Sequence, residues 1–93
     1  MKETFKIEGI FYVFNEWTIV INSKVSEEIK DYNMDDEIFL LTSDNKVITS
    51  ATLTNHLKLS KNGNLSIGLI VDNKIETEKM KESRSFVFKK DLS

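Results

Sequence analysis

The residue types that most often perform chemistry in proteins are scarce in this chain of 93 residues. His56 is its only histidine, and a histidine that acts as a general base needs a nucleophile or a carboxylate to orient it. Ser60 and Asp72 are of the right types, but nothing in their spacing brings them to His56. The sequence therefore predicts that the protein is not an enzyme and that His56 lies on the surface or on an edge strand.

Metal ligands show no recognisable spacing either. The acidic run Asp35-Asp36-Glu37 lacks the alternating oxygen ligands of a calcium-binding loop, so we interpret it as a turn that precedes a strand. The chain contains no cysteine, which excludes a disulfide framework and a thiolate metal site and suits a reducing compartment. We therefore predict no metal and no cofactor.

Binding to another macromolecule requires exposed aromatic or basic side chains, and the chain has both. Tyr12 and Trp17 offer ring faces on which unpaired bases can stack. However, 15 acidic residues outnumber 13 basic ones, and a formal net charge of −2 disfavours nucleic acid. A protein is therefore the preferred partner and RNA the alternative, and the residues predicted to contact the partner are Tyr12, Trp17, His56 and Lys58. A basic strip, if one forms, consists of Lys58, Lys61, Lys89 and Lys90.

The elements that position these residues are predicted to be β-strands. Residues 5–14 (FKIEGIFYVF) alternate with a period of two, and Gly9 is expected to mark a bend. The second half of this segment is apolar on both faces, which predicts a strand that is covered on both sides. After a short loop at Asn15-Glu16, residues 17–25 are rich in β-branched side chains and are expected to complete an antiparallel hairpin.

The rest of the chain continues the β pattern. A second hairpin joins residues 37–42 to residues 46–58 through Asp44-Asn45, and Asn62-Gly63 is the turn into a strand over residues 64–73. In that strand, Gly68 is expected to allow a close approach of neighbouring groups. Residues 26–37 are predicted to be a loop, because the stretch lacks a second apolar helical turn.

A charged stretch over residues 74–83 is predicted to be a surface turn or a short helical turn, with only Ile75 and Met80 able to point inward. It leads to a last strand, Phe86–Phe88. Six extended segments predict one all-β domain over residues 1–93, a small closed six-stranded antiparallel β-barrel. Its predicted interior contains Phe5, Ile7, Phe11, Val20, Ile38, Leu40, Ile67, Leu69 and Phe86.

Several short motifs also follow the order of a known family. They are FKIEGIFYV (residues 5–13), TIVI (18–21) leading to Lys24-Val25, MDDEIFL (34–40), IGLIV (67–71) and SRSFVF (83–88). In this order they resemble the second domain of translational GTPases of the elongation factor Tu type, over nearly the whole chain. The resemblance implies a six-stranded β-barrel. In that family the domain lies beside a GTPase domain and helps to hold the aminoacyl end of transfer RNA.

The chain also departs from the family pattern. It has no phosphate-binding loop of the Gly-x-x-x-x-Gly-Lys-Ser/Thr type, so nucleotide hydrolysis is not implied. The family's Glu and Arg after the fourth strand would fall within residues 52–58 (TLTNHLK), which contain neither. Where the family has a Gly-Arg-Gly turn, this chain has Asn15-Glu16-Trp17. Trp17 is therefore either a plug for the barrel end or an exposed anchor for a protein partner, and the plug is the preferred interpretation.

Together these observations predict a stand-alone, non-catalytic binding module. A protein is the expected partner; the alternatives are an RNA-binding accessory of translation and a small immunity-type inhibitor, whose usual profile is a short, acidic, cysteine-free chain. The longest apolar run, Leu69-Ile70-Val71, is far too short to span a membrane, and the N-terminus has no uninterrupted apolar segment. We therefore expect a soluble, cytoplasmic protein, whose oligomeric state the sequence does not indicate.

Overall fold

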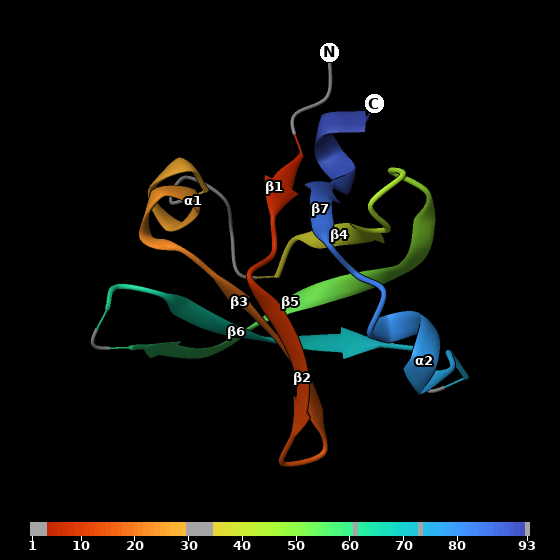
Figure 1. The fold of residues 1–93 in the computed structure, drawn as a ribbon, viewed down its shortest axis with the longest axis horizontal. Helices are drawn as coiled ribbons and strands as arrows, with labels where there is room; N and C mark the ends of the chain where they lie inside the picture. Colours follow the sequence, from red (N-terminus) through yellow and green to blue (C-terminus); the bar gives the residue numbers. More distant parts are fainter. Residues whose placement is uncertain (1–3, 30–34, 61, 73, 93) are drawn as a thin grey trace.

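The structure, a computed structural model, describes residues 4–29, 35–60, 62–72 and 74–92, apart from the side chains of residues 55–57 and 92. A strongly bent antiparallel sheet makes up most of it, with short helices at its margins (Figure 1). The strands are β1 (Phe5–Lys6), β2 (Gly9–Val13), β3 (Glu16–Ile21), β4 (Glu37–Leu41), β5 (Val47–Leu59), β6 (Leu65–Val71) and β7 (Ser85–Phe88). The helices are α1 (Ser23–Glu28), α2 (Thr77–Met80) and the 3-10 helix η1 (Lys89–Leu92).

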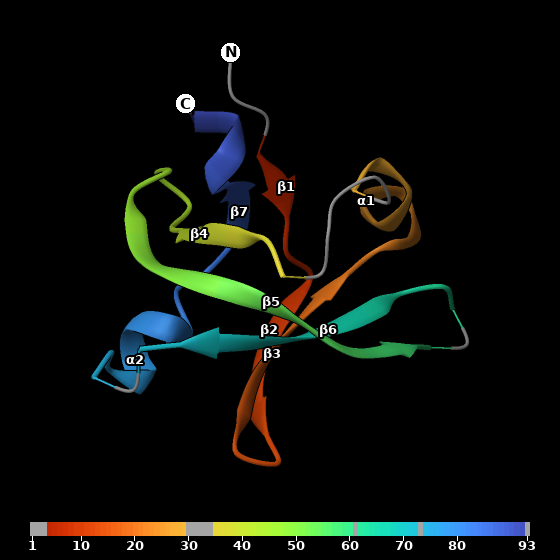
Figure 2. The same ribbon diagram turned by 180° about the vertical axis from the view of Figure 1, so that it is seen from behind.

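Within the described residues the sheet has seven strands in the order β1-β7-β4-β5-β6-β3-β2, and every neighbouring pair is antiparallel. The predicted all-β, antiparallel class is therefore confirmed. The strand order has two ends, β1 and β2, so the predicted closed six-stranded barrel is not confirmed. Seen from behind, β5 crosses the molecule diagonally between β4 and β6 (Figure 2), as its pairing with both requires.

The two end strands of this order are consecutive in the sequence, and the chain bends between them. Ile7 donates its backbone N–H to the carbonyl of Arg84 at 3.0 Å, beside β7, whereas Glu8 donates to the carbonyl of Val20 at 2.7 Å, on β3. One N-terminal segment therefore pairs with β7 in its first half and with β3 in its second half. The bend lies directly before Gly9, where the sequence indicated one.

The bend also shifts the side-chain alternation by one residue. Phe5 and Ile7 are buried, but on β2 it is Ile10 that packs against the core, while Phe11 is 56% exposed. The prediction that Phe11 belongs to the interior is therefore wrong, because a shift of one residue moves every following side chain to the other face. Val20 is also outside the core. On β3 the buried positions are Trp17, Ile19 and Ile21, which leaves Val20 on the opposite face.

The remaining residues of the predicted interior are buried: Phe5, Ile7, Ile38, Leu40, Ile67, Leu69 and Phe86. Three phenylalanine rings meet at the centre of β1 and β7. The ring centroids of Phe5 and Phe86 lie 5.4 Å apart, those of Phe5 and Phe88 5.8 Å, and those of Phe86 and Phe88 5.7 Å. This cluster joins the N-terminal strand to the C-terminal strand. The last strand is therefore a central part of the core.

The second predicted strand is shorter than expected, because a helix begins before its end. β3 stops at Ile21, and the side chain of Asn22 accepts a hydrogen bond from the backbone N–H of Val25 at 2.9 Å, which caps α1. Val25 and Ile29, four residues apart, are both buried on one face. The extension of the strand to Val25 and the loop prediction for residues 26–28 are therefore wrong. The rest of that predicted loop lies mostly outside the described residues.

The later elements follow the predictions closely. The turn into β5 contains Asn45 with a positive φ of 63°, and the turn into β6 contains Gly63 with a φ of 87°. The charged connection includes the short helical turn α2, from which Met80 is fully buried and near which Ile75 packs against the core.

Candidate functional site

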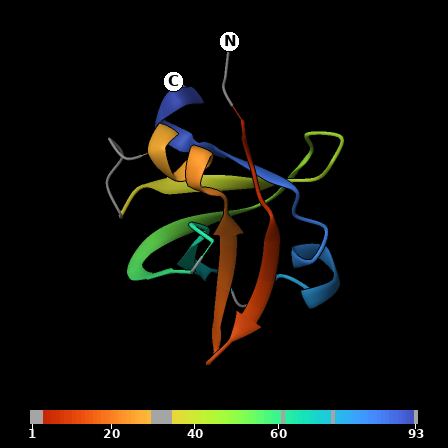
Figure 3. The same ribbon diagram turned by 60° about the vertical axis from the view of Figure 1, so that its left-hand side comes forward.

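The hairpin formed by β2 and β3 carries four consecutive large apolar residues, Phe11, Tyr12, Val13 and Phe14, which we call the aromatic hairpin. Their exposed fractions are 56%, 58%, 44% and 97%. The hairpin extends away from the rest of the sheet, at the lower end of the view in Figure 1 and again in Figure 3. The prediction that this segment is covered on both sides is therefore wrong. Beyond the bend, β2 has β3 as its strand partner and no second strand among the described residues.

The turn of the aromatic hairpin has an unusual first residue. Val13 pairs with Glu16, so the connection consists of the two residues Phe14 and Asn15, one position earlier than the predicted loop. Both have positive φ angles, 51° and 62°, as in a type I′ turn. Asn and Gly are the usual residues in such a turn, because a bulky side chain is sterically unfavourable at positive φ. Phe14 occupies this position with its ring almost entirely in solvent.

A cleft of about 520 Å³ lies beside the hairpin. Tyr12 and Trp17 line it from the hairpin, with their ring centroids 5.2 Å apart and their planes inclined at 62°. Ile70 and Ile75 contribute apolar surface from the end of β6 and the segment before α2. Trp17 is only 7% exposed, which agrees with the preferred plug interpretation and places its ring between the core and the cleft.

Glu16 also lines the cleft, and its carboxylate lies close to the backbone of β6 at Gly68. Thr54 donates its hydroxyl to the carbonyl of Gly68 at 2.9 Å. A Cβ atom at Gly68 would lie 2.8 Å from the Thr54 hydroxyl oxygen and would overlap the carboxylate of Glu16. The predicted close approach at Gly68 is therefore confirmed: Glu16 lies across the backbone of β6 because position 68 has no side chain.

The four residues predicted to contact a partner do not form one site. Tyr12 and Trp17 are adjacent across the hairpin. Lys58 is exposed on β5, where it pairs with Ser66 of β6, and two strands, β6 and β3, lie between β5 and β2. His56 also belongs to β5, but its side chain lies outside the described part of the structure. The prediction did not identify Phe14 as exposed. The sequence signal for its exposure is its place directly before Asn15, between two segments that pair as a hairpin.

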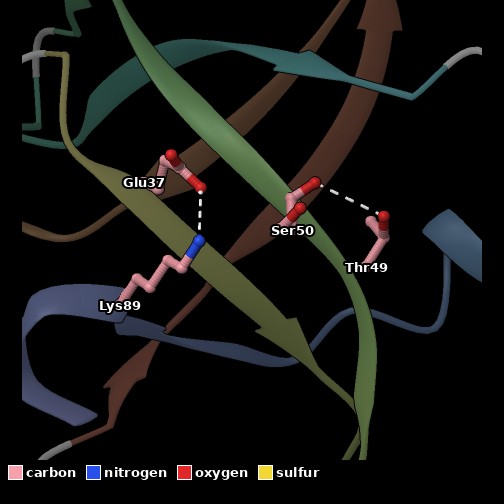
Figure 4. A network of polar contacts seen from close by, with 4 residues as sticks. All are labelled: Glu37, Thr49, Ser50 and Lys89. Carbon is pink, nitrogen blue, oxygen red and sulfur yellow. Dashed lines mark hydrogen bonds and ion pairs between the residues drawn. The ribbon is translucent and has the colours of Figure 1, made fainter. Parts of the chain in front are cut away.

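The predicted basic strip is partly neutralised by local ion pairs. The ammonium group of Lys89 lies 3.2 Å from the carboxylate of Glu37, and that of Lys90 lies 2.7 Å from the carboxylate of Asp36. Figure 4 shows the pair of Lys89 and Glu37 near the hydrogen bond, 3.3 Å long, that the Thr49 hydroxyl donates to the Ser50 carbonyl. Asp36 directly precedes β4 and Glu37 is its first residue. Both carboxylates form ion pairs with lysines.

Among the described residues, no group of three or more histidine, aspartate or glutamate side chains is arranged to hold a metal ion. Within the same part of the chain, no helix has the length and apolar character needed to cross a membrane.

The comparisons with known proteins found no match: no family model, no curated protein and no solved structure corresponds to this chain. The resemblance to the second domain of translational GTPases therefore stays a prediction from the sequence.

Proposed function

We propose that this protein is a stand-alone, non-catalytic binding module that contacts a protein partner through the aromatic hairpin and the adjoining cleft. The single observation that carries the proposal is Phe14, which is 97% exposed at a φ of 51°. A phenylalanine ring in water forgoes roughly 1.5–3 kcal/mol of burial free energy. A bulky side chain in the left-handed region adds a cost of about 1–2 kcal/mol.

The backbone cost falls on the folded protein, whereas the burial free energy of the ring is gained only when a partner covers it. Phe11 and Val13 add exposed apolar surface on one face of the hairpin, and Tyr12 and Trp17 line the cleft on the other face. Exposed apolar surface is a common property of protein-binding sites, whose central contacts are enriched in aromatic residues. The site therefore suits a partner that offers an apolar concave surface to the hairpin tip.

The proposed module is a six-stranded barrel in which β1 and β2 act together as one bent strand. Support comes from the two hydrogen bonds of Ile7 and Glu8, which lead the same segment from β7 to β3. The similarity to the second domain of translational GTPases, and a role for the protein near the translation machinery, are part of this proposal on the strength of the ordered sequence motifs alone. A cytoplasmic location is the expectation for a chain without cysteine.

Protein is favoured over RNA because the 15 acidic residues of the chain outnumber its 13 basic ones. Two of the lysines considered for a basic strip, Lys89 and Lys90, are engaged by Glu37 and Asp36. Affinity for RNA depends strongly on lysine and arginine contacts with phosphates, so this arrangement predicts weak binding. An immunity-type inhibitor is one specific form of protein-binding module, and the same site would serve it.

The experiment that tests the proposal is affinity capture with three versions of the full chain: wild type, Phe14→Asn and Leu59→Asn. Asn is compatible with the turn at position 14, so the first variant removes the ring without disturbing the fold. Leu59, 69% exposed on β5, provides a matched loss of exposed apolar surface away from the hairpin. We expect a protein that is captured by wild type and by Leu59→Asn and lost with Phe14→Asn, and calorimetry with that purified protein should reproduce the order.

Equal capture by all three versions would contradict the proposed site. Captured material that disappears on ribonuclease treatment, and whose binding weakens steeply as the salt concentration rises, would replace the protein partner by RNA.

A further inference from the structure

One edge of β2 has no partner strand in the described part of the chain, along the apolar part of the strand. In a two-residue hairpin the flanking residues, here Val13 and Glu16, exchange both backbone hydrogen bonds. Because this pattern alternates along an antiparallel ladder, Gly9, Phe11 and Val13 direct their backbone groups toward β3. Ile10 and Tyr12 direct theirs toward the opposite edge. Within the described residues, β2 pairs with no strand but β3, so two N–H and two C=O groups face outward there.

This edge lacks the features that usually prevent strand addition. Natural edge strands carry charged residues, prolines or bulges, or they are very short. β2 has five residues, and the segment from Gly9 to Phe14 contains neither a charged residue nor a proline. The other end of the strand order, β1, is only two residues long and includes Lys6. An extended strand is the partner that such an edge is built to accept.

The residue pattern of β2 is complementary to itself. If two copies pair antiparallel with Phe11 opposite Phe11, then Ile10 of each copy lies opposite Tyr12 of the other. In this register all four outward-facing backbone groups of each copy gain hydrogen-bond partners. The two Phe11 rings form a cross-strand aromatic pair, and Gly9 lies opposite Val13. The first charged residues, Glu8 and Glu16, fall outside the paired core, so no like charges are brought opposite each other.

We propose that two copies of this chain associate through the β2 edge, in an antiparallel two-fold pairing centred on Phe11. Such an interface is isologous, with the same surface contributed by each copy. The proposal goes beyond the binding module proposed above and does not rest on it, since it concerns the strand edge rather than the turn at Phe14.

The available apolar area determines the expected strength. The two exposed aromatic side chains of the paired segment, Phe11 and Tyr12, supply roughly 400 Å² for each copy, given the 150–250 Å² that an aromatic side chain typically buries. The total of roughly 800 Å² lies below the size of stable interfaces. We therefore expect a reversible dimer that forms in the micromolar to millimolar range.

The absence of cysteine from the chain permits a direct test of the register by single-cysteine cross-linking. Cα atoms of a directly opposed, non-hydrogen-bonded pair lie about 4.5 Å apart, within the range that a disulfide requires. Phe11→Cys is therefore expected to form a disulfide-linked dimer under mild oxidation. Val13→Cys is the matched control on the same face, because two copies of position 13 would lie about 13 Å apart. Leu59→Cys reports random collisions between exposed thiols. We expect the Phe11→Cys dimer to form at least about tenfold faster than either control.

Sedimentation supplies an independent measurement without a covalent bond. Wild type should show a reversible monomer–dimer equilibrium between roughly 10 µM and 1 mM, the range expected for an interface of this size. Phe11→Lys should lose it, and an equimolar mixture of Phe11→Lys with Phe11→Glu should regain it, because only this register places position 11 opposite itself. A monomeric wild type at the highest concentration, equal cross-linking of the three cysteine variants, or a mixture that does not associate would each overturn the proposal. Phe14→Asn should still dimerise, so a failure of the proposed partner site can be told apart from a failure of the dimer.

Discussion

Two aromatic groups of this protein arise from the same kind of sequence and reach opposite environments. Phe5, Phe86 and Phe88 form a buried cluster whose ring centroids lie 5.4 to 5.8 Å apart, whereas Phe11, Tyr12 and Phe14 of the aromatic hairpin are exposed by more than half. Both belong to short apolar β-segments. The difference is what lies opposite each strand.

β1 pairs with β7, and the face that carries Phe5 is covered by the rest of the core. β2 continues the same segment, but after the bend it follows β3 away from that core. An apolar pattern thus indicates that a strand can be buried, and the path of the chain decides whether it is. The apolar surface that the fold leaves exposed is the best candidate for binding.

The largest expected effect comes from the buried side of the comparison. Phe86→Ala removes a fully buried ring from the contact of β1 with β7, and its cost should be about 3–5 kcal/mol of unfolding free energy. Urea denaturation followed by circular dichroism measures it. Phe11→Ala, the matched substitution on the hairpin, should change stability by less than about 0.5 kcal/mol. A similar loss of unfolding free energy in the two variants would contradict the distinction between the buried cluster and the exposed hairpin.

Trp17 lies between the buried cluster and the exposed hairpin, and its substitution tests to which of the two regions it belongs. The side chain is buried on the core side and lines the cleft on the other, so Trp17→Ala should cost about 3 kcal/mol, the lower end of the range for buried aromatic residues. Since Trp17 is the only tryptophan, its emission also reports its environment in wild type. A blue-shifted native spectrum and a destabilised variant are expected. A red-shifted, easily quenched tryptophan together with unchanged stability of the variant would instead support the exposed-anchor interpretation.

The smallest effect, and the only stabilising one, is expected at the turn of the hairpin. Phe14→Asn replaces a bulky residue at positive φ by one that tolerates this conformation, and it should raise the free energy of unfolding by about 0.5–1 kcal/mol. Thermal unfolding followed by circular dichroism measures the gain. Phe14→Val is the control, because a β-branched residue is no better suited to the turn and should bring no gain. A destabilised Asn variant would mean that the ring contributes to the fold after all.

The features that were predicted correctly depend mostly on residues close in sequence, and those that were missed depend on contacts between distant strands. Local signals were sufficient for the strands around Asp44-Asn45 and Asn62-Gly63, for the close approach at Gly68 and for the short helical turn before β7, because each depends on residues near in sequence or on one glycine. The helix after β3 was missed although its cap, Asn22, is also local. Its stability depends on Val25 and Ile29, which are buried by distant strands.

Period-two patterns and turn residues are enough to predict an all-β chain with antiparallel hairpins, and residue types are enough to single out Tyr12 and Trp17 as binding candidates. Which apolar residues are covered depends instead on how the strands pack in the folded protein. A one-residue shift at the bend turned Phe11 outward, and the partner exchange at Ile7 and Glu8 directed the hairpin away from the core. Alternation depends on neighbouring residues within one strand, whereas burial depends on which distant strands pack against it, and for that reason Phe14 was recognised as exposed only in the folded protein.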